Sequence, residues 1–270
     1  MTSRPGRMPV LQRERRFHDE WATGIEVEHL DVARHFEGST SPENRFILRQ
    51  LGDLRGKYVL DLGCGAGEAS VYFALRGARS VAADCSAGML EVALRLAERH
   101  GVSIDTMVMD ATHLDVPDNT FDVVYAANLL HHVTPSAVLP EIHRVLKPGG
   151  KACFWDPLAH NPAIKVYRMM AKEVRTDDEH PLTMAIVRDV RSLFREVAYD
   201  TFWLFALWIF IRFYLIERVH PNDERYWKKI ITDEPRLRPL YCRLERLDQL
   251  VKRLPWIKRF AWNIAVVATK

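Results

Sequence analysis

The clearest chemical signal in this sequence is an apolar run that contains an acid and ends in a glycine-rich turn. The run at 58–62 contains Asp61, and Gly63, Gly65 and Gly67 follow it. Glycine lets the backbone approach a ligand closely, and the free N–H groups of the helix after the turn favour negative charge. Asp61 would repel a pyrophosphate. The pattern therefore favours a ligand that carries an ammonium group beside a carboxylate.

Two further acids stand where apolar runs end. Asp84 closes the run at 80–84, and Asp110 follows the run at 104–109. Asp84 lies about twenty residues after the first glycine, where an acid binds the ribose in open α/β sheets. Each acid also has a structural explanation, because Asp84 could cap the next helix and Asp110 could form an Asx turn.

Two adjacent histidines, His131 and His132, follow the apolar run at 121–127. A histidine at such a place can orient a substrate or accept a proton near neutral pH. We therefore name His132 as a catalytic candidate. A structural role for the pair is the alternative.

These residues require a sheet that brings several strand ends together. Helical patterns separate the apolar runs, the first at 9–22 and the next at 41–51, where we expect Ser41 to cap the helix. Strands alternating with helices predict an α/β fold. The predicted strands are 58–62, 80–84, 104–109, 121–127, 151–155, 194–203 and 259–268.

The order and spacing of these motifs resemble the class I S-adenosylmethionine-dependent methyltransferases, especially the small-molecule branch related to ubiquinone and menaquinone biosynthesis. The resemblance covers residues 55–157 closely. It implies a Rossmann-like, doubly wound, seven-stranded sheet whose last strand is antiparallel. It rests on 59–67, Asp84, 109–111, Phe121-Asp122, 130–132 and 144–150.

The resemblance also implies S-adenosyl-L-methionine as the cofactor and offers a residue for each of its chemical groups. Asp61 and Asn128 would accept from the ammonium group, and the turn with Gly63, Gly65 and Gly67 would hold the carboxylate. The remaining residues would hold the adenosine: Asp84 the ribose, Met89 and Ala111 the flat faces of the adenine, and Asp110 its amino group.

We expect three parts along the chain. Residues 1–54 would form an N-terminal helical lid, and residues 55–204 with 258–270 the cofactor-binding core. Two insertions, 157–182 and 205–257, would form a helical cap at the carboxyl edge of the sheet, where ligands of α/β sheets bind. The cap would then choose the methyl acceptor.

The cap combines an apolar, aromatic run with basic residues, which suits a hydrophobic small molecule with an anionic head. The layout resembles that of prenyl diphosphate carbon-methyltransferases. This resemblance implies that Glu173 of this chain would accept a proton and that Mg²⁺ could accompany the diphosphate. O-methylation of a hydroxyl or carboxyl group stays open, and so does a solvated face for the charged residues. The substrate-binding candidates are Trp21, Tyr167, Arg168, Arg175, His180, Trp203 and Trp208.

Composition restricts the class of protein. The 270 residues include 38 basic and 35 acidic ones, a balance that argues against a nucleic-acid partner. The cysteines show no Cys-x-x-Cys pair and no ligand spacing, so we expect reduced thiols and no structural metal. The basic N-terminus lacks an apolar stretch behind it, so we expect no signal peptide and a cytoplasmic protein.

The segment 201–216 is the most apolar part of the chain, but it contains Arg212 and is shorter than the roughly twenty residues of a membrane span. We expect a buried strand that runs into a buried helix. An interfacial helix is the alternative, and it would make the protein a membrane-peripheral quinone or lipid methyltransferase. The sequence gives no indication of an oligomeric state.

Overall fold

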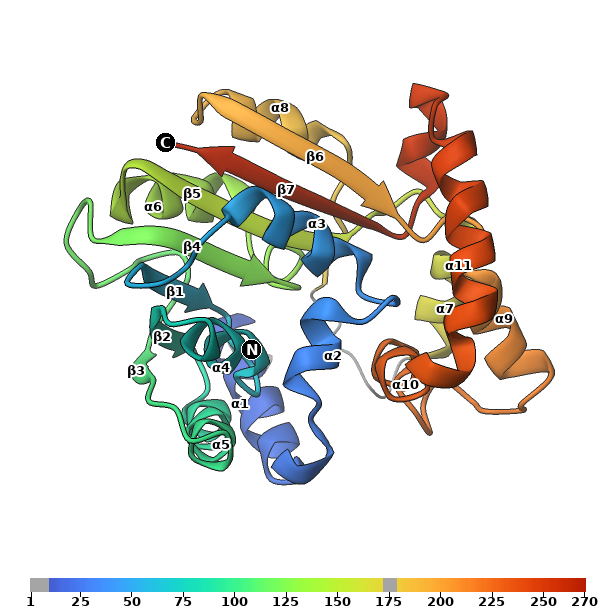
Figure 1. Cartoon of the computed structure of the whole chain (residues 1–270), viewed down its shortest axis with the longest axis horizontal. Coiled ribbons are helices and arrows are strands. Elements are labelled where there is room, and N and C mark those ends of the chain that lie inside the picture. The colour runs from blue at the N-terminus through green and yellow to red at the C-terminus, as the bar shows by residue number, and fades with distance from the viewer. Residues whose placement is uncertain (1–9, 172–178) are drawn as a thin grey trace, which may run out of the picture.

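The computed structural model describes residues 10–171 and 179–270. Its centre is a seven-stranded sheet with the strand order β3-β2-β1-β4-β5-β7-β6, in which β7 runs antiparallel to both of its neighbours (Figure 1). The predicted fold class is therefore confirmed. The strands are β1 (Tyr58–Leu62), β2 (Arg79–Asp84), β3 (Asp105–Val108), β4 (Phe121–Ala127), β5 (Leu146–Pro157), β6 (Glu196–Phe202) and β7 (Asn263–Thr269).

Each face of the sheet carries its own hydrophobic core. Alternate strand residues such as Val59 and Tyr125 pack beneath helices α4 (Glu68–Leu75) and α5 (Ala87–Arg99). The residues between them, such as Leu60, face α6 (Pro135–Val145) and α8 (Ala185–Arg191) instead. Because the central strands β1 and β4 are covered on both sides, they are almost entirely apolar, which is why the sequence revealed them. The edge strands β3 and β6 are more exposed.

The N-terminal residues form α1 (Val10–Ala22), α2 (Val32–Glu37) and α3 (Pro42–Leu51), and α1 packs on the beginning of α5 (Figure 1). The contact is polar: the Asp19 carboxylate accepts from the Ser86 hydroxyl at 2.5 Å and from the Gly88 amide at 3.2 Å. The expected capping by Ser41 is wrong in detail, because its hydroxyl donates to the Arg34 carbonyl instead.

The long connection between β6 and β7 is helical and lies beyond the ends of the strands, together with α7 (Figure 1). Ring contacts join these helices: Tyr167 lies 5.3 Å from both Phe210 and Tyr226, measured between ring centroids. The buried Asp248 fixes the turn after β6 by accepting from two backbone amides. The elements are α7 (Pro162–Met170), α9 (Trp208–Leu215), α10 (Tyr226–Thr232), α11 (Glu234–Val251) and η2 (Pro255–Phe260).

The apolar segment 201–216 contains the end of β6, which is buried as expected, and the short helix α9, which is buried on one face only. Ile209, Phe210 and Phe213 are buried, whereas Leu215 and Ile216 are exposed. Within the two ranges that the structure describes, no helix has the length and apolarity needed to cross a membrane.

The largest differences from the predicted strand boundaries are at the beginnings of the last strand and the fifth strand. The last strand begins at Asn263, not at 259, because 255–260 form a 3-10 helix whose apolar residues had suggested strand. The fifth strand begins at Leu146, five residues early, and its register with β4 shifts between Phe121 and Val123. The Lys147–Gly150 stretch is therefore part of an irregular strand, not a loop.

Candidate cofactor and substrate site

A cavity of about 290 Å³ lies at the carboxyl ends of β1 and β4. The turn after β1 forms one side, α1 and the α2–α3 connection form another, and the cap covers the rest. Residues far apart in the sequence therefore share one space, among them Trp21, Gly65, His132, Trp203 and Lys228.

The glycines of the turn after β1 are required by its geometry. Gly67 has φ of 85°, and a Cβ there would lie 2.4 Å from the Cβ of Ala93. Gly65 has φ of 52°, and no atom lies within 4 Å of the position its Cβ would take. The Gly65 backbone therefore borders open space, as a backbone that receives a ligand must.

Asp61 lines the cavity from the end of β1. Its carboxylate accepts from the amide of Ser70 at 2.9 Å and from the Ser70 hydroxyl at 2.6 Å, and only 2% of the residue is exposed. Burial raises the pKa of Asp61 to about 7. A cationic group in the cavity would favour its ionised form.

Asp84 is bound to the backbone of the turn. One carboxylate oxygen accepts from the Gly65 amide at 3.0 Å and the other from the Ser86 amide at 2.9 Å. Helix α1 packs on the residues that follow, since Arg15 donates to the Cys85 carbonyl. Asp84 does not itself line the cavity.

The predicted adenine residues also lie outside the cavity lining. Asp110 accepts from the amide and the hydroxyl of Thr112, both at 2.8 Å, which is the Asx turn that the sequence left open. Met89 and Ala111 are buried in the two cores. Their contact with adenine stays a prediction, as does that of Asp110.

Asn128 follows β4 and does line the cavity. It adopts a left-handed conformation with φ of 52°, and its amide donates to the Trp155 carbonyl at 2.9 Å. This turn places the next residues, including both histidines, at the cavity wall. The ammonium contact predicted for Asn128 stays a prediction.

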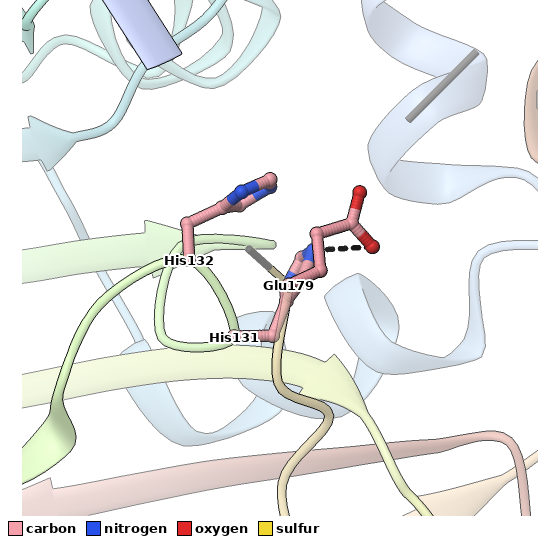
Figure 2. Close-up of side chains that lie close together, drawn as sticks. All are labelled: His131, His132 and Glu179. Atoms are coloured by element: carbon pink, nitrogen blue, oxygen red, sulfur yellow. Dashed lines mark ion pairs between the residues drawn. The ribbon is translucent and has the colours of Figure 1, made fainter. Parts of the chain in front are cut away.

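His131 is held by an acid that sequence reasoning missed. Its Nδ1 lies 2.7 Å from the buried Asp156 carboxylate, which also accepts from the His131 amide at 3.1 Å. Figure 2 shows the other side of the ring facing Glu179, with Nε2 3.9 Å from the carboxylate. Asp156 follows the last apolar residue of β5, and that position was the available signal.

His132 faces α1 instead. Its Nδ1 lies 3.3 Å from the carboxylate of Glu14, an α1 residue that is buried although charged. Burial lowers the pKa of His132, but the hydrogen bond and charge of Glu14, together with the charges of Glu179 and Asp156, outweigh burial, so the pKa is raised above its usual value. Glu14 of the N-terminal helix α1 thus contributes to the raised pKa of a histidine in the core domain.

His131, His132 and Glu179 form the one group of possible metal ligands among the described residues. Their ligand atoms lie within 4.8 Å of one another, whereas ligands about 2 Å from one ion lie about 3.3 Å apart. The group has a single carboxylate, and Mg²⁺ prefers oxygen ligands. The geometry therefore offers no fitting Mg²⁺ site at this place.

Most of the predicted substrate residues reach the cavity: Trp21, Tyr167, Arg168 and Trp203 line it. His180 does not, and its amide donates to the His131 carbonyl at 2.6 Å. Trp208 lies outside the lining and is 58% exposed, because it is on the outer face of α9. Glu173 and Arg175 lie outside the described residues.

Several lining residues come from parts of the sequence without a recognisable motif. Arg225, Trp227 and Lys228 come from the beginning of α10, and Glu43 and Asn44 come from α3. Burial raises the pKa of Glu43 to about 7. Only the fold brings these residues to the cavity, so sequence spacing could not identify them.

Comparison with known proteins places the core in a family. Residues 60–154 match the methyltransferase domain family. The ubiquinone biosynthesis O-methyltransferase of Pseudomonas syringae is 37% identical over 124 residues, which are 45% of this chain and 53% of that protein. The demethylmenaquinone methyltransferase of Renibacterium salmoninarum is 39% identical over 42% of this chain and 47% of its own length. The chain thus spans about half the length of these relatives.

The fold extends beyond the matched segment. A Haemonchus contortus phosphoethanolamine N-methyltransferase, solved with phosphomonomethylethanolamine and S-adenosylhomocysteine, aligns with a TM-score of 0.58. The alignment covers 96% of this chain and 58% of that one at 19% identity, so it shows a shared fold.

Proposed function

We propose that this chain, whose residues 60–154 form a class I S-adenosylmethionine-dependent methyltransferase domain, transfers a methyl group to a hydrophobic small molecule. The cavity carries the proposal, because it joins the glycine turn of that domain to an aromatic wall under the cap. Trp155, Trp203 and Trp262 belong to that wall. A donor at the turn and an acceptor under the cap would share one cavity.

The donor would lie along the turn with its ammonium group at Asp61 and its carboxylate at the amides of residues 63–67. Asp84 would hold the ribose, since each carboxylate oxygen accepts one backbone amide and keeps a second lone pair for a ribose hydroxyl. Phe17 and His18 of α1 line the same cavity, so α1 would exclude water from the sulfonium.

The sulfonium activates the methyl group, so the protein aligns the reactants and accepts a proton. For an acceptor hydroxyl, neutral His132 would take the proton as the oxygen forms its bond to the methyl carbon and the C–S bond breaks. Glu14 would stabilise the resulting imidazolium at 3.3 Å. His131, which Asp156 holds in place, would fix the backbone beside His132.

The acceptor is proposed to carry an anionic head, and two chemistries remain. In one, oxygen is methylated with His132 as the base. In the other, an isoprenoid diphosphate carbon is methylated and Glu173 accepts the proton. Any Mg²⁺ would have to enter with the diphosphate, because His131, His132 and Glu179 do not fit this ion. A transfer assay with labelled S-adenosylmethionine and geranyl diphosphate distinguishes the two chemistries. No transfer, together with full activity of Glu173→Gln on another acceptor, would exclude the carbon chemistry.

A membrane-peripheral quinone or lipid methyltransferase is the second candidate, and one surface favours it. Trp208, Leu215 and Ile216 are 58%, 65% and 72% exposed on and after α9. Such a surface could lie at a lipid interface. Sedimentation with vesicles tests this candidate, and a chain that stays in the supernatant excludes it.

Titration calorimetry with S-adenosylhomocysteine tests the proposed function itself. We expect saturable binding at one site per chain. A chain that binds none of the ligand would contradict methyl transfer by this site.

A further inference from the structure

Two cations of the cap line the cavity without a carboxylate partner. Arg225 and Lys228 stand at the beginning of α10, and neither forms an ion pair with any residue in 10–171 or 179–270. Arg168 on the opposite helix differs, because its guanidinium lies 3.2 Å from the Glu179 carboxylate. The positive charge available to a ligand therefore comes from α10.

Aromatic rings hold both cations in place. The Arg225 guanidinium carbon lies 3.6 Å from the centre of the Trp21 ring. The Lys228 ammonium lies 4.9 Å from the same ring and 5.5 Å from the ring of Trp227. A ring face stabilises a cation, but a stacked guanidinium keeps its N–H donors at its edge. Those donors are therefore available to a ligand.

Such a pair is costly without an anion. Both side chains are partly buried, and burial lowers the pKa of Arg225 to about 10 and also lowers that of Lys228. Arg225 remains charged at neutral pH. A charge withdrawn from water is stabilised when a counter-charge reaches it, so the cavity favours an anionic ligand.

We propose that Arg225 and Lys228 bind the phosphate or carboxylate head of the methyl acceptor, an inference that rests on the proposed function. The planar guanidinium matches two oxygens of such a head, and the ammonium adds a point charge. Ring contacts lead from this subsite to the chemistry: Trp21 lies 5.7 Å from His18, which lies 6.2 Å from His132. The head would thus be anchored across the α1 rings from the proposed base.

The cofactor's own carboxylate is the other source of an anion. Glu68, which follows the glycine turn, acts electrostatically on Lys228. Lys228 is therefore close enough to the glycine turn to interact with a cofactor carboxylate bound there. An experiment must separate loss of the acceptor head from loss of the cofactor.

Calorimetry with sodium pyrophosphate, titrated into the full chain saturated with S-adenosylhomocysteine at constant ionic strength, makes this separation. Arg225→Gln and Lys228→Gln should each weaken pyrophosphate binding about tenfold or more. Lys229→Gln is the matched control, since Lys229 is paired with Glu224 at 3.1 Å and does not line the cavity. It should change the affinity by about twofold or less.

The affinity for S-adenosylhomocysteine should stay the same in all variants, and Arg225→Lys should retain more pyrophosphate affinity than Arg225→Gln. Unchanged pyrophosphate affinity in both glutamine variants would overturn the proposal. A wild-type chain that binds S-adenosylhomocysteine but not pyrophosphate would also overturn it. A loss of cofactor affinity alone would assign the cations to the cofactor carboxylate. A wild-type chain without S-adenosylhomocysteine affinity would instead contradict the proposed function.

Discussion

The two ends of the cavity are built in different ways. At the donor end, acids lie within about twenty positions of the backbone amides they hold, as Asp61 holds Ser70 at 2.9 Å and Asp84 holds Gly65 at 3.0 Å. At the acceptor end, contacts join residues about two hundred positions apart, as Arg225 stacks on Trp21 at 3.6 Å. The backbone of the donor end is therefore formed by two neighbouring strands and the turn after β1, whereas the acceptor end exists only when the cap and α1 have packed.

This contrast teaches that the two ends can change independently. A substitution in the turn at 63–67 should alter cofactor binding whichever acceptor is used, because the proposed cofactor contacts are made by the backbone of that turn. A change in the cap should alter acceptor binding and leave the cofactor in place. Between the two ends, His132 lines the cavity and contacts Glu14 of α1.

The largest effect is expected at this junction. His132→Gln should lower kcat by about 10²–10⁴-fold if His132 is the base, with little change in cofactor affinity. The wild-type rate should rise with pH through a pKa above 6.5, because the pKa of His132 is raised and only the neutral ring accepts a proton. A pH profile of kcat measures this, and an active variant with the wild-type profile would contradict the role.

At the donor end, Gly67→Ala should destabilise the fold by about 2–4 kcal/mol, because it combines a left-handed backbone with overpacking. The new methyl would lie 2.4 Å from the Cβ of Ala93. Gly101→Ala is the control, since Gly101 ends α5 in a left-handed cap with φ of 66° but nothing lies within 4 Å of the position its Cβ would take. It should cost about 1 kcal/mol. Urea unfolding measures both, and equal losses would remove the steric explanation.

Asp61→Asn should weaken S-adenosylhomocysteine binding about tenfold to a hundredfold, through loss of a charged partner for the ammonium. Wild-type binding should weaken as pH falls through about 7, because the pKa of Asp61 is near 7 and its protonated form cannot attract a cation. Calorimetry between pH 6 and about 8.5 checks the sign. Binding that strengthens on acidification would refute the role.

The smallest effect is expected on the outer face of the cap. Trp208 is 58% exposed and does not line the cavity, so Trp208→Ser should change the free energy of unfolding by about 0.5 kcal/mol or less. Activity on a soluble acceptor should also persist. Only association with vesicles should fall, and a large loss of activity in solution would show that this tryptophan reaches the acceptor.

The sequence was sufficient for the sheet because its central strands are buried on both faces and the turn after β1 needs glycine. It also identified cavity-lining residues whose neighbours are local, such as Asp61 beside Gly63, and their contact with a cofactor stays a prediction. It was less informative where an acid can serve the backbone or a ligand equally well, as Asp110 does with Thr112.

The sequence could not reveal pairs formed by packing alone. Glu14 meets His132 across more than a hundred residues, and no spacing rule connects them. The same is true of Arg225 and Trp21. These contacts depend on how α1 and the cap close over the sheet, which is a property of tertiary packing.

The most direct test of the central claim is a calorimetric titration of S-adenosylhomocysteine into the wild-type chain and Asp61→Asn at pH 8. The account predicts one saturable site in the wild type and binding weakened about tenfold or more in the variant. Equal affinity in both proteins, or no binding to the wild type, would contradict a donor site at the glycine turn.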